Sequence, residues 1–282
     1  MATQNHPGAE DEGSSRAAER PEPSTGRPDR PDPSDGAPAL EDVYDRLDRV
    51  DDPELDRSIV ELGYVERVAV DGGRVEVAFV LPTAWCSPAF AWMMATGIRD
   101  EVGSLPAVEA VRVDLRDHMH GEEINHGVNE GLAFDEAFDD ADSGIEAVRE
   151  KLDEKARLAR QFHAFDALLD AGLTPAQVAD LRLEDVDPAF EADRAAVPLR
   201  EGAVTVTLPA EPLTDYLEKA QATGLVSGEA DRLFADRDGE PFDAEAFEEV
   251  RRQSRVADAN VTGQGAICSA LHEARNGVVA DD

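Results

Sequence analysis

The stretch RVEVAFVLPTAWCSP, residues 74–88, contains the pattern that decides the fold of the first half of the chain. Its apolar residues alternate with others up to Leu81, which is typical of a strand with one buried face. Ser87-Pro88 then has the form of a helix start, with serine as the N-cap and proline in the first turn. We therefore predict a buried strand that leads directly into a helix, with Cys86 at the junction.

The segments on both sides of this junction complete a small α/β domain. The predicted elements are, in chain order, a helix at 40–50 that ends near Asp51-Asp52-Pro53, strands at 65–70 and 75–81 joined by the turn Asp71-Gly72-Gly73, a helix from 88 to about 98, and a strand at 108–115. The order helix-strand-strand-helix-strand is enough for a two-layer domain. We place this domain at residues 39–118.

The remaining chain divides by composition into three parts. Residues 1–38 are rich in Pro, Gly, Ser and charged residues and have too few apolar residues to fold, which predicts a disordered tail. A polar loop at 117–131 and an acidic stretch after it predict a linker over 119–142. Residues 143–282 have helical periodicity and predict a mainly helical module, so that the fold class of the chain is α+β.

Within the module, capping and stop signals divide the chain further. The predicted elements are a long helix from the capping box at 143–146 to Gly172, a short helix from a second cap at 174–177 to about 183, strands within 197–208 with a turn at Glu201-Gly202, helices at 211–223 and 243–256, and a last helix at 266–276 closed by Gly277.

The charge of the chain is extreme, with 62 acidic against 27 basic residues and a formal net charge of −35. Salt screens the self-repulsion of such a surface, so we interpret the charge as an adaptation to a cytoplasm with molar salt. The charge argues against nucleic-acid and anionic-membrane partners. No apolar run approaches the ~20 residues that span a bilayer, and no secretion signal is recognisable. We expect a cytoplasmic protein whose two cysteines are free thiols or ligands.

Cys86 is the strongest candidate for a chemically active residue. Its predicted place beside a helix start brings the sulfur close to free N–H groups and the positive end of the helix dipole. Both favour the thiolate, which is the form that binds a metal or attacks an electrophile. A buried cysteine that fills a gap in the core is the alternative, and the residues alone leave both open.

Three short motifs around this residue occur in a specific order and spacing. They are Asp52-Pro53-Glu54, Glu61-Leu62-Gly63-Tyr64-Val65 and Thr83-x-x-Cys86-x-Pro88. Together they resemble the MIP18-like family of iron–sulfur cluster assembly factors. The resemblance implies a small α/β fold, participation in maturing iron–sulfur or iron enzymes, and no catalysis of its own. It also implies that Cys86 is a transient ligand of iron or a cluster and that Asp52 lies near it. We predict that Glu54 and Thr83 belong to the same site.

The chain departs from that family at two points. Tyr64 stands where many members have leucine, and Ser87 separates Cys86 from the proline that usually follows the cysteine directly. The longer run 85–90, with Asp117-His118, resembles a branch encoded beside bacterial binuclear-iron monooxygenases, whose members carry a helical C-terminal extension. This resemblance implies an apo-metalloenzyme, such as an oxygenase, as the client. An accessory subunit of an oxygenase that handles no metal is the alternative function.

Further candidate ligands are few. A cluster usually needs four thiolates, whereas the chain has only Cys86 and Cys268. Stable binding therefore needs a homodimer, a histidine or a partner protein. Cys268, predicted near the start of the last helix, could favour the thiolate or be a small core residue. His118 and His120 lie among carboxylates that suit iron or zinc, or they belong to a polar loop.

Two other features have a plainer interpretation. His163 and His272 are each alone on a predicted helix and are interpreted as structural. The stretch 171–186 resembles the helical core of tyrosine recombinases, but Thr174 stands where that family has its first catalytic arginine. The terminal tyrosine of that family is also missing. A degenerate, noncatalytic module of that kind is the remaining interpretation of this segment.

Overall fold

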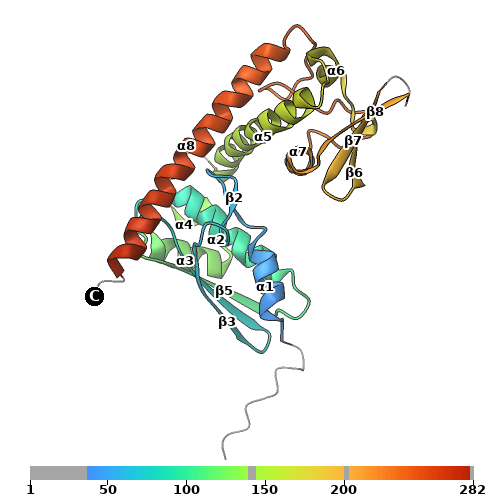
Figure 1. Cartoon of the computed structure of the whole chain (residues 1–282). Coiled ribbons are helices and arrows are strands. Elements are labelled where there is room, and N and C mark those ends of the chain that lie inside the picture. The colour runs from blue at the N-terminus through green and yellow to red at the C-terminus, as the bar shows by residue number, and fades with distance from the viewer. Residues whose placement is uncertain (1–36, 139–143, 200–202, 280–282) are drawn as a thin grey trace, which may run out of the picture. The chain divides into compact units, whose positions relative to one another are not determined.

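The computed structural model describes residues 37–138, 144–199 and 203–279, with side chains up to residue 275 (Figure 1). Nearly all of the predicted tail at 1–38 lies outside these residues, as do Ser143 of the first predicted cap and the turn at Glu201-Gly202. The predicted α+β class is confirmed, because a sheet-and-helix part precedes a mainly helical part. No helix in the described residues is long and apolar enough to cross a membrane.

The first part contains every element that the sequence predicts, together with additional short ones. They are α1 (Leu40–Leu47), β1 (Asp51–Asp52), β2 (Arg57–Ser58), β3 (Val65–Asp71), β4 (Arg74–Val80), α2 (Pro88–Gly103), β5 (Ala110–Arg116), α3 (Gly121–Glu130) and α4 (Phe134–Ala137). α1 ends at Leu47, a turn earlier than expected, because β1 and β2 pair antiparallel directly after it.

A three-stranded sheet in the order β3-β4-β5 forms the base of this part. β3 and β4 are antiparallel, and Asp71 pairs with Arg74 across a turn of two glycines. β5 lies parallel to β4, which requires a crossover connection, and α2 provides it. Val77 and Phe79 of β4 are fully buried in one core with residues of α1 and α2. This packing fixes both ends of the loop between β4 and α2, the loop that contains Cys86.

The prediction of a polar loop at 117–131 is wrong for most of that range, because residues 121–130 form α3. Ile124 and Val128, one turn apart, are buried in the same core as the sheet. The side chain of Asn125 bonds the N–H and C=O of Leu115 at 2.7 and 3.0 Å. Asn129 bonds Val113 in the same way at 2.9 and 2.8 Å. Because a carboxamide can both donate and accept, the two asparagines cover the open edge of β5.

The second part is built on two long helices that run side by side (Figure 1). Its elements are α5 (Ile145–Asp170), α6 (Pro175–Asp180), the 3-10 turn Leu183–Asp185, β6 (Asp187–Glu191), β7 (Arg194–Leu199), β8 (Val204–Pro209), α7 (Glu211–Ala222) and α8 (Phe247–Val279). The predicted strand pair is confirmed as β7 and β8, and β6 joins it unpredicted. The end of α5 at Gly172, which has a φ of +97°, is confirmed, as is the cap of α6 by Thr174 and Gln177.

The prediction of two separate helices at 243–256 and 266–276 is wrong. A single helix, α8, covers most of both ranges and continues through Gly277. Glycine inside a helix costs only about 1 kcal/mol each. Packing of α8 against α5 and against the first part outweighs that cost: Ala257 lies in a buried cluster with α5, and Gly265 lies beside Leu55. The continuity of α8 decides where Cys268 lies.

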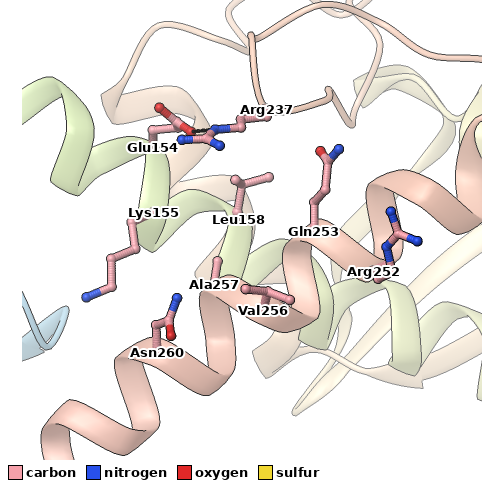
Figure 2. Close-up of a pocket in the computed structure, with 9 residues that line it drawn as sticks. All are labelled: Glu154, Lys155, Leu158, Arg237, Arg252, Gln253, Val256, Ala257 and Asn260. Carbon is pink, nitrogen blue, oxygen red and sulfur yellow. Dashed lines mark hydrogen bonds and ion pairs between the residues drawn. The ribbon is translucent and has the colours of Figure 1, made fainter.

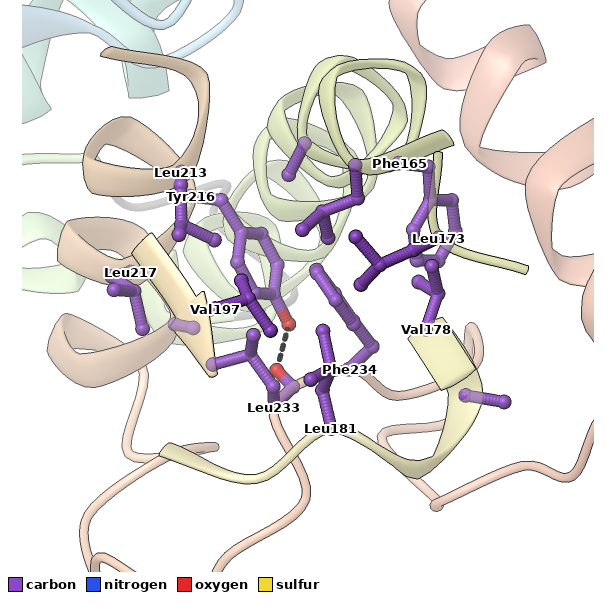
Figure 3. Close-up of a cluster of buried hydrophobic side chains, with 14 of the residues drawn as sticks. Phe165, Leu173, Val178, Leu181, Val197, Leu213, Tyr216, Leu217, Leu233 and Phe234 are labelled. Carbon is purple, nitrogen blue, oxygen red and sulfur yellow. Dashed lines mark hydrogen bonds between the residues drawn. The ribbon is translucent and has the colours of Figure 1, made fainter. Parts of the chain in front are cut away.

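Aromatic side chains fill the core of the second part (Figure 3). Phe165 of α5 lies against Phe234 and Phe247, with ring centroids 4.8 and 5.0 Å apart. Tyr216 of α7 is fully buried, and its hydroxyl donates to the Leu233 carbonyl at 2.6 Å. This core therefore joins α5, α7, α8 and the segment around residue 234 into one unit.

Candidate functional site

The Cys86 sulfur lies in a tight loop between β4 and α2. Its N–H donates to the Thr83 carbonyl at 3.4 Å, and its sulfur lies 3.6 Å from the Thr83 hydroxyl oxygen. The same oxygen accepts the N–H of Trp85 at 3.2 Å. Because that bond occupies the hydroxyl as an acceptor, its hydrogen is available to the sulfur. Thr83, which the motif singled out, thus shapes the loop and positions the sulfur.

The start of α2 differs in one detail from the expectation. Ser87 is the N-cap residue, but its side chain makes no capping bond. Pro88 fixes the backbone at the first helical position, so the helix starts without that bond. In the part of the chain that the structure describes, the hydrogen-bond partner of the Cys86 sulfur is Thr83, and not an N–H group of the helix.

His118 holds the backbone of Cys86. Its Nδ1 accepts the N–H of His120 at 3.2 Å, so its Nε2 carries the hydrogen and donates to the Cys86 carbonyl at 3.0 Å. Burial lowers the pKa of His118, which favours this neutral ring. Both ring nitrogens are therefore engaged in holding the loop. A metal-ligating role for His118 and His120 stays a prediction, and for His118 it requires one of these bonds to break.

Asp52 organises the turn of the first motif. Its Oδ1 accepts the N–H groups of Glu54 and Leu55 at 2.9 and 3.2 Å, and its Oδ2 accepts the Tyr64 hydroxyl at 3.4 Å. Burial raises the pKa of Asp52. The carbonyl of Glu54 accepts the Lys155 ammonium at 3.2 Å, which ties this turn to α5. Asp52 and the backbone of Glu54 thus hold this turn, and their predicted role beside Cys86 stays a prediction.

Tyr64 is a site residue that the sequence marked only as a departure from the family. Its buried ring lies 5.7 Å from the ring of His272 on α8. Burial raises the pKa of its hydroxyl, and the charges of Asp52, Cys268 and Cys86 raise it further. Tyr64 therefore lies within electrostatic range of all three groups.

The structure places Cys268 in the interior of α8, so the prediction that it lies near a helix start is wrong. Burial raises the pKa of the Cys268 thiol to about 11, and the charges of Asp52, Cys86 and Glu54 add to the shift. The charge of Cys86 therefore influences the titration of Cys268. Cys268 opens onto a cavity of about 160 Å³ that Tyr64 and His272 also line. The long helix thus brings a second thiol within electrostatic range of Cys86.

Residues 40–115 match the iron–sulfur cluster assembly protein family. The match extends from α1 into β5 and includes the Asp52 turn and the Cys86 loop, which supports a general role in iron–sulfur cluster assembly together with other proteins. α5 to α8, and with them Cys268, lie outside the match. No curated protein matches the chain.

A different cavity, of about 270 Å³, lies between α5 and α8 (Figure 2). Its apolar wall consists of Leu158, Val256 and Ala257, and the ion pair of Glu154 with Arg237 borders it at 2.8 Å. It contains no cysteine or histidine. Among the described residues, no group of three or more His, Cys, Asp or Glu side chains is arranged to hold a metal. The Cys86 loop therefore remains the candidate site.

The raised pKa of Cys268 leads to a testable prediction. The thiolate is the reactive form, so in a Cys86→Ser variant iodoacetamide should label Cys268 at pH 8 on the order of a hundredfold more slowly than an ordinary thiol. The rate should rise with every pH step through the range below pH 11, the value about which Cys268 titrates. The measurement is the labelled fraction against time at several pH values, determined by mass spectrometry.

The unfolded chain in urea is the control, because there Cys268 should titrate as an ordinary cysteine near pH 8.5, roughly the value of the free amino acid. If the labelling rate of Cys268 reached its plateau at the same pH in the folded protein as in the unfolded chain, the prediction would be wrong. The surroundings of Cys268 would then not raise its pKa.

Proposed function

We propose that this chain matures iron–sulfur or iron proteins by holding iron or a cluster transiently at Cys86 and passing it to a client apoprotein. The observation that carries the proposal is that the family match includes the loop that holds the Cys86 sulfur half-exposed beside the Thr83 hydroxyl. The iron or cluster is cargo in this function. The C-terminal module, with α5 to α8, recognises the client, and a metal-dependent oxygenase is the client class that the sequence resemblance implies.

The number of ligands indicates how the cargo is held. The chain has two cysteines, and a cluster usually takes four thiolates. Cys86 and Cys268 supply two of them in our proposal, so the others come from a second copy or from the client. Binding requires both thiols to lose their protons, which a bound cation favours. Shared ligands also allow transfer, because client thiolates can replace those of the carrier one at a time.

Anaerobic reconstitution of the full-length protein with ferrous iron and sulfide tests the proposal. We expect wild type to show sulfur-to-iron charge-transfer absorption and bound iron, and Cys86→Ser to lose most of both. Cys268→Ser should bind less iron than wild type and more than Cys86→Ser, because Cys86 is the primary ligand. Circular dichroism of each variant shows that the fold is retained.

Absence of absorption and of bound iron in wild type and Cys86→Ser alike would refute cluster or iron carriage. If the protein nevertheless copurified with an oxygenase subunit, the alternative of an accessory subunit that handles no metal would replace the proposal. Equal iron content of wild type and Cys268→Ser would restrict the ligand role to Cys86.

A further inference from the structure

Large apolar side chains are exposed directly beside the proposed cargo site. Trp85, the neighbour of Cys86, has 77% of its surface exposed, and Met119 is exposed as well. The two loops that carry them are joined by a hydrogen bond from the Met119 N–H to the Ala84 carbonyl at 3.0 Å. Trp85 and Met119 are therefore carried by two loops that lie side by side.

α8 also carries exposed apolar side chains near these loops. Arg275 donates to the Leu81 carbonyl at 2.8 Å and to the Asp117 carboxylate at 2.5 Å, which attaches this flank of α8 to the same two loops. Leu271 lies one turn before Arg275 and Ile267 one turn before Leu271, and residues four apart share a side of a helix. Both are exposed. We call Trp85, Met119, Ile267 and Leu271 the apolar rim.

The fold does not require an exposed tryptophan at this place. The chain has two tryptophans, and Trp92, only 4% exposed, fills the core of the α/β domain. Trp85 contributes no comparable burial. A large aromatic side chain left in water is unusual for a packing residue and common at protein interfaces, where tryptophan carries much of the binding energy.

The charge around the apolar rim indicates what kind of surface fits it. The exposed Glu122 and Glu123 in the first turn of α3 follow Met119 closely, and the exposed Glu273 lies next to the α8 part of the rim. The chain as a whole carries a net charge of −35. A second copy would bring the same acidic border and would fit less well, whereas a surface with lysine or arginine would be attracted.

From this arrangement we infer that the apolar rim is the docking surface for a client protein that presents an apolar side chain among basic residues. This inference rests on the proposed function for the identity of the partner as a client. Docking here brings the ligands of the client to Cys86, because Trp85 precedes that residue directly. Transfer of iron or a cluster needs such an approach, since the thiolates of carrier and client must share the cargo.

Site-specific photo-crosslinking tests the inference with the full chain in its native host. A benzophenone amino acid replaces Trp85 in one variant and Phe190, also exposed but located on β6, in the control variant. The crosslinked peptides are identified by mass spectrometry. We expect the Trp85 position, and not the Phe190 position, to capture an iron or iron–sulfur protein at an apolar residue flanked by lysine or arginine.

Binding of the captured protein, purified in its apo form, is then measured by calorimetry. Trp85→Ala should raise the dissociation constant about tenfold or more, as loss of an interface tryptophan does. Replacing both Glu122 and Glu123 by glutamine should raise the dissociation constant by a smaller factor. It should also make the dissociation constant less dependent on salt concentration. Trp85→Ala should still bind iron as wild type does, which separates docking from cargo binding.

Three results would overturn the inference: crosslinks from position 85 to a second copy of this chain alone, the same partners at positions 85 and 190, or unchanged affinity of Trp85→Ala. Failure of iron reconstitution in wild type would instead remove the proposed function, and the crosslinking result would still decide whether the rim binds a basic protein surface.

Discussion

Replacement of Phe165 by alanine is expected to lower the free energy of unfolding of the C-terminal module by about 3–5 kcal/mol. Phe165 is fully buried on α5, and its ring contacts Phe234, Phe247 and Phe242. Its removal leaves a cavity between α5 and the start of α8, which the surrounding rings cannot close completely. The loss combines the transfer free energy of the ring with the cost of that cavity.

Two probes locate this effect. Both tryptophans lie in the α/β domain, so tryptophan fluorescence follows that domain, whereas most helical residues, which dominate far-ultraviolet circular dichroism, lie in α5 to α8. In denaturant titrations, Phe165→Ala should shift the dichroism midpoint more than the fluorescence midpoint. Phe190→Ala, at a side chain that is 44% exposed, is the control and should shift neither. An unchanged dichroism midpoint for Phe165→Ala would contradict the packing described above.

Trp92→Ala is expected to destabilise the α/β domain by about 3–5 kcal/mol. The Trp92 ring lies edge-on against Phe134 and Phe138, with centroids 5.5 and 6.1 Å apart. Gly127 of α3 approaches so closely that an added Cβ would lie 2.6 Å from the Trp92 ring. The ring therefore holds α3 and α4 against α2. Besides the lower stability, amide hydrogen exchange should increase over 121–138.

Trp85→Ala is the matched control for this variant, because it removes the same side chain from an exposed position. Its stability should equal that of wild type within about 0.5 kcal/mol, the usual range for surface substitutions. That result would also show that any docking defect of Trp85→Ala is not a folding defect. Equal destabilisation by both substitutions would contradict the burial that the structure assigns to the two tryptophans.

Local patterns in the sequence determined much of the α/β domain. Alternation over 75–81 predicted β4, the glycines after Asp71 predicted the hairpin, and Ser87-Pro88 predicted the start of α2, all confirmed within a few residues. These signals are local, because periodicity and turn residues act within one element. The same holds for the motif around Cys86, whose match to a cluster-assembly family is confirmed for residues 40–115.

Contacts between distant segments decided the rest. The pairing of Asn125 with Leu115 is a relation between a helix and a strand edge that no periodicity encodes, although the spacing of Ile124 and Val128 could have indicated α3. The continuity of α8 depends on packing that outweighs the weak helix propensity of its glycines.

Cys86 illustrates this division. Its place between a strand and a helix follows from residues 74–88 alone. Its surroundings do not, because His118 bonds its backbone and its charge acts on Tyr64 and Cys268, and these residues come from three separate segments of the chain. Only the tertiary structure brings the second thiol, on α8, within electrostatic range of Cys86, since side-chain packing over long sequence separations, and not local propensity, sets the path of that helix.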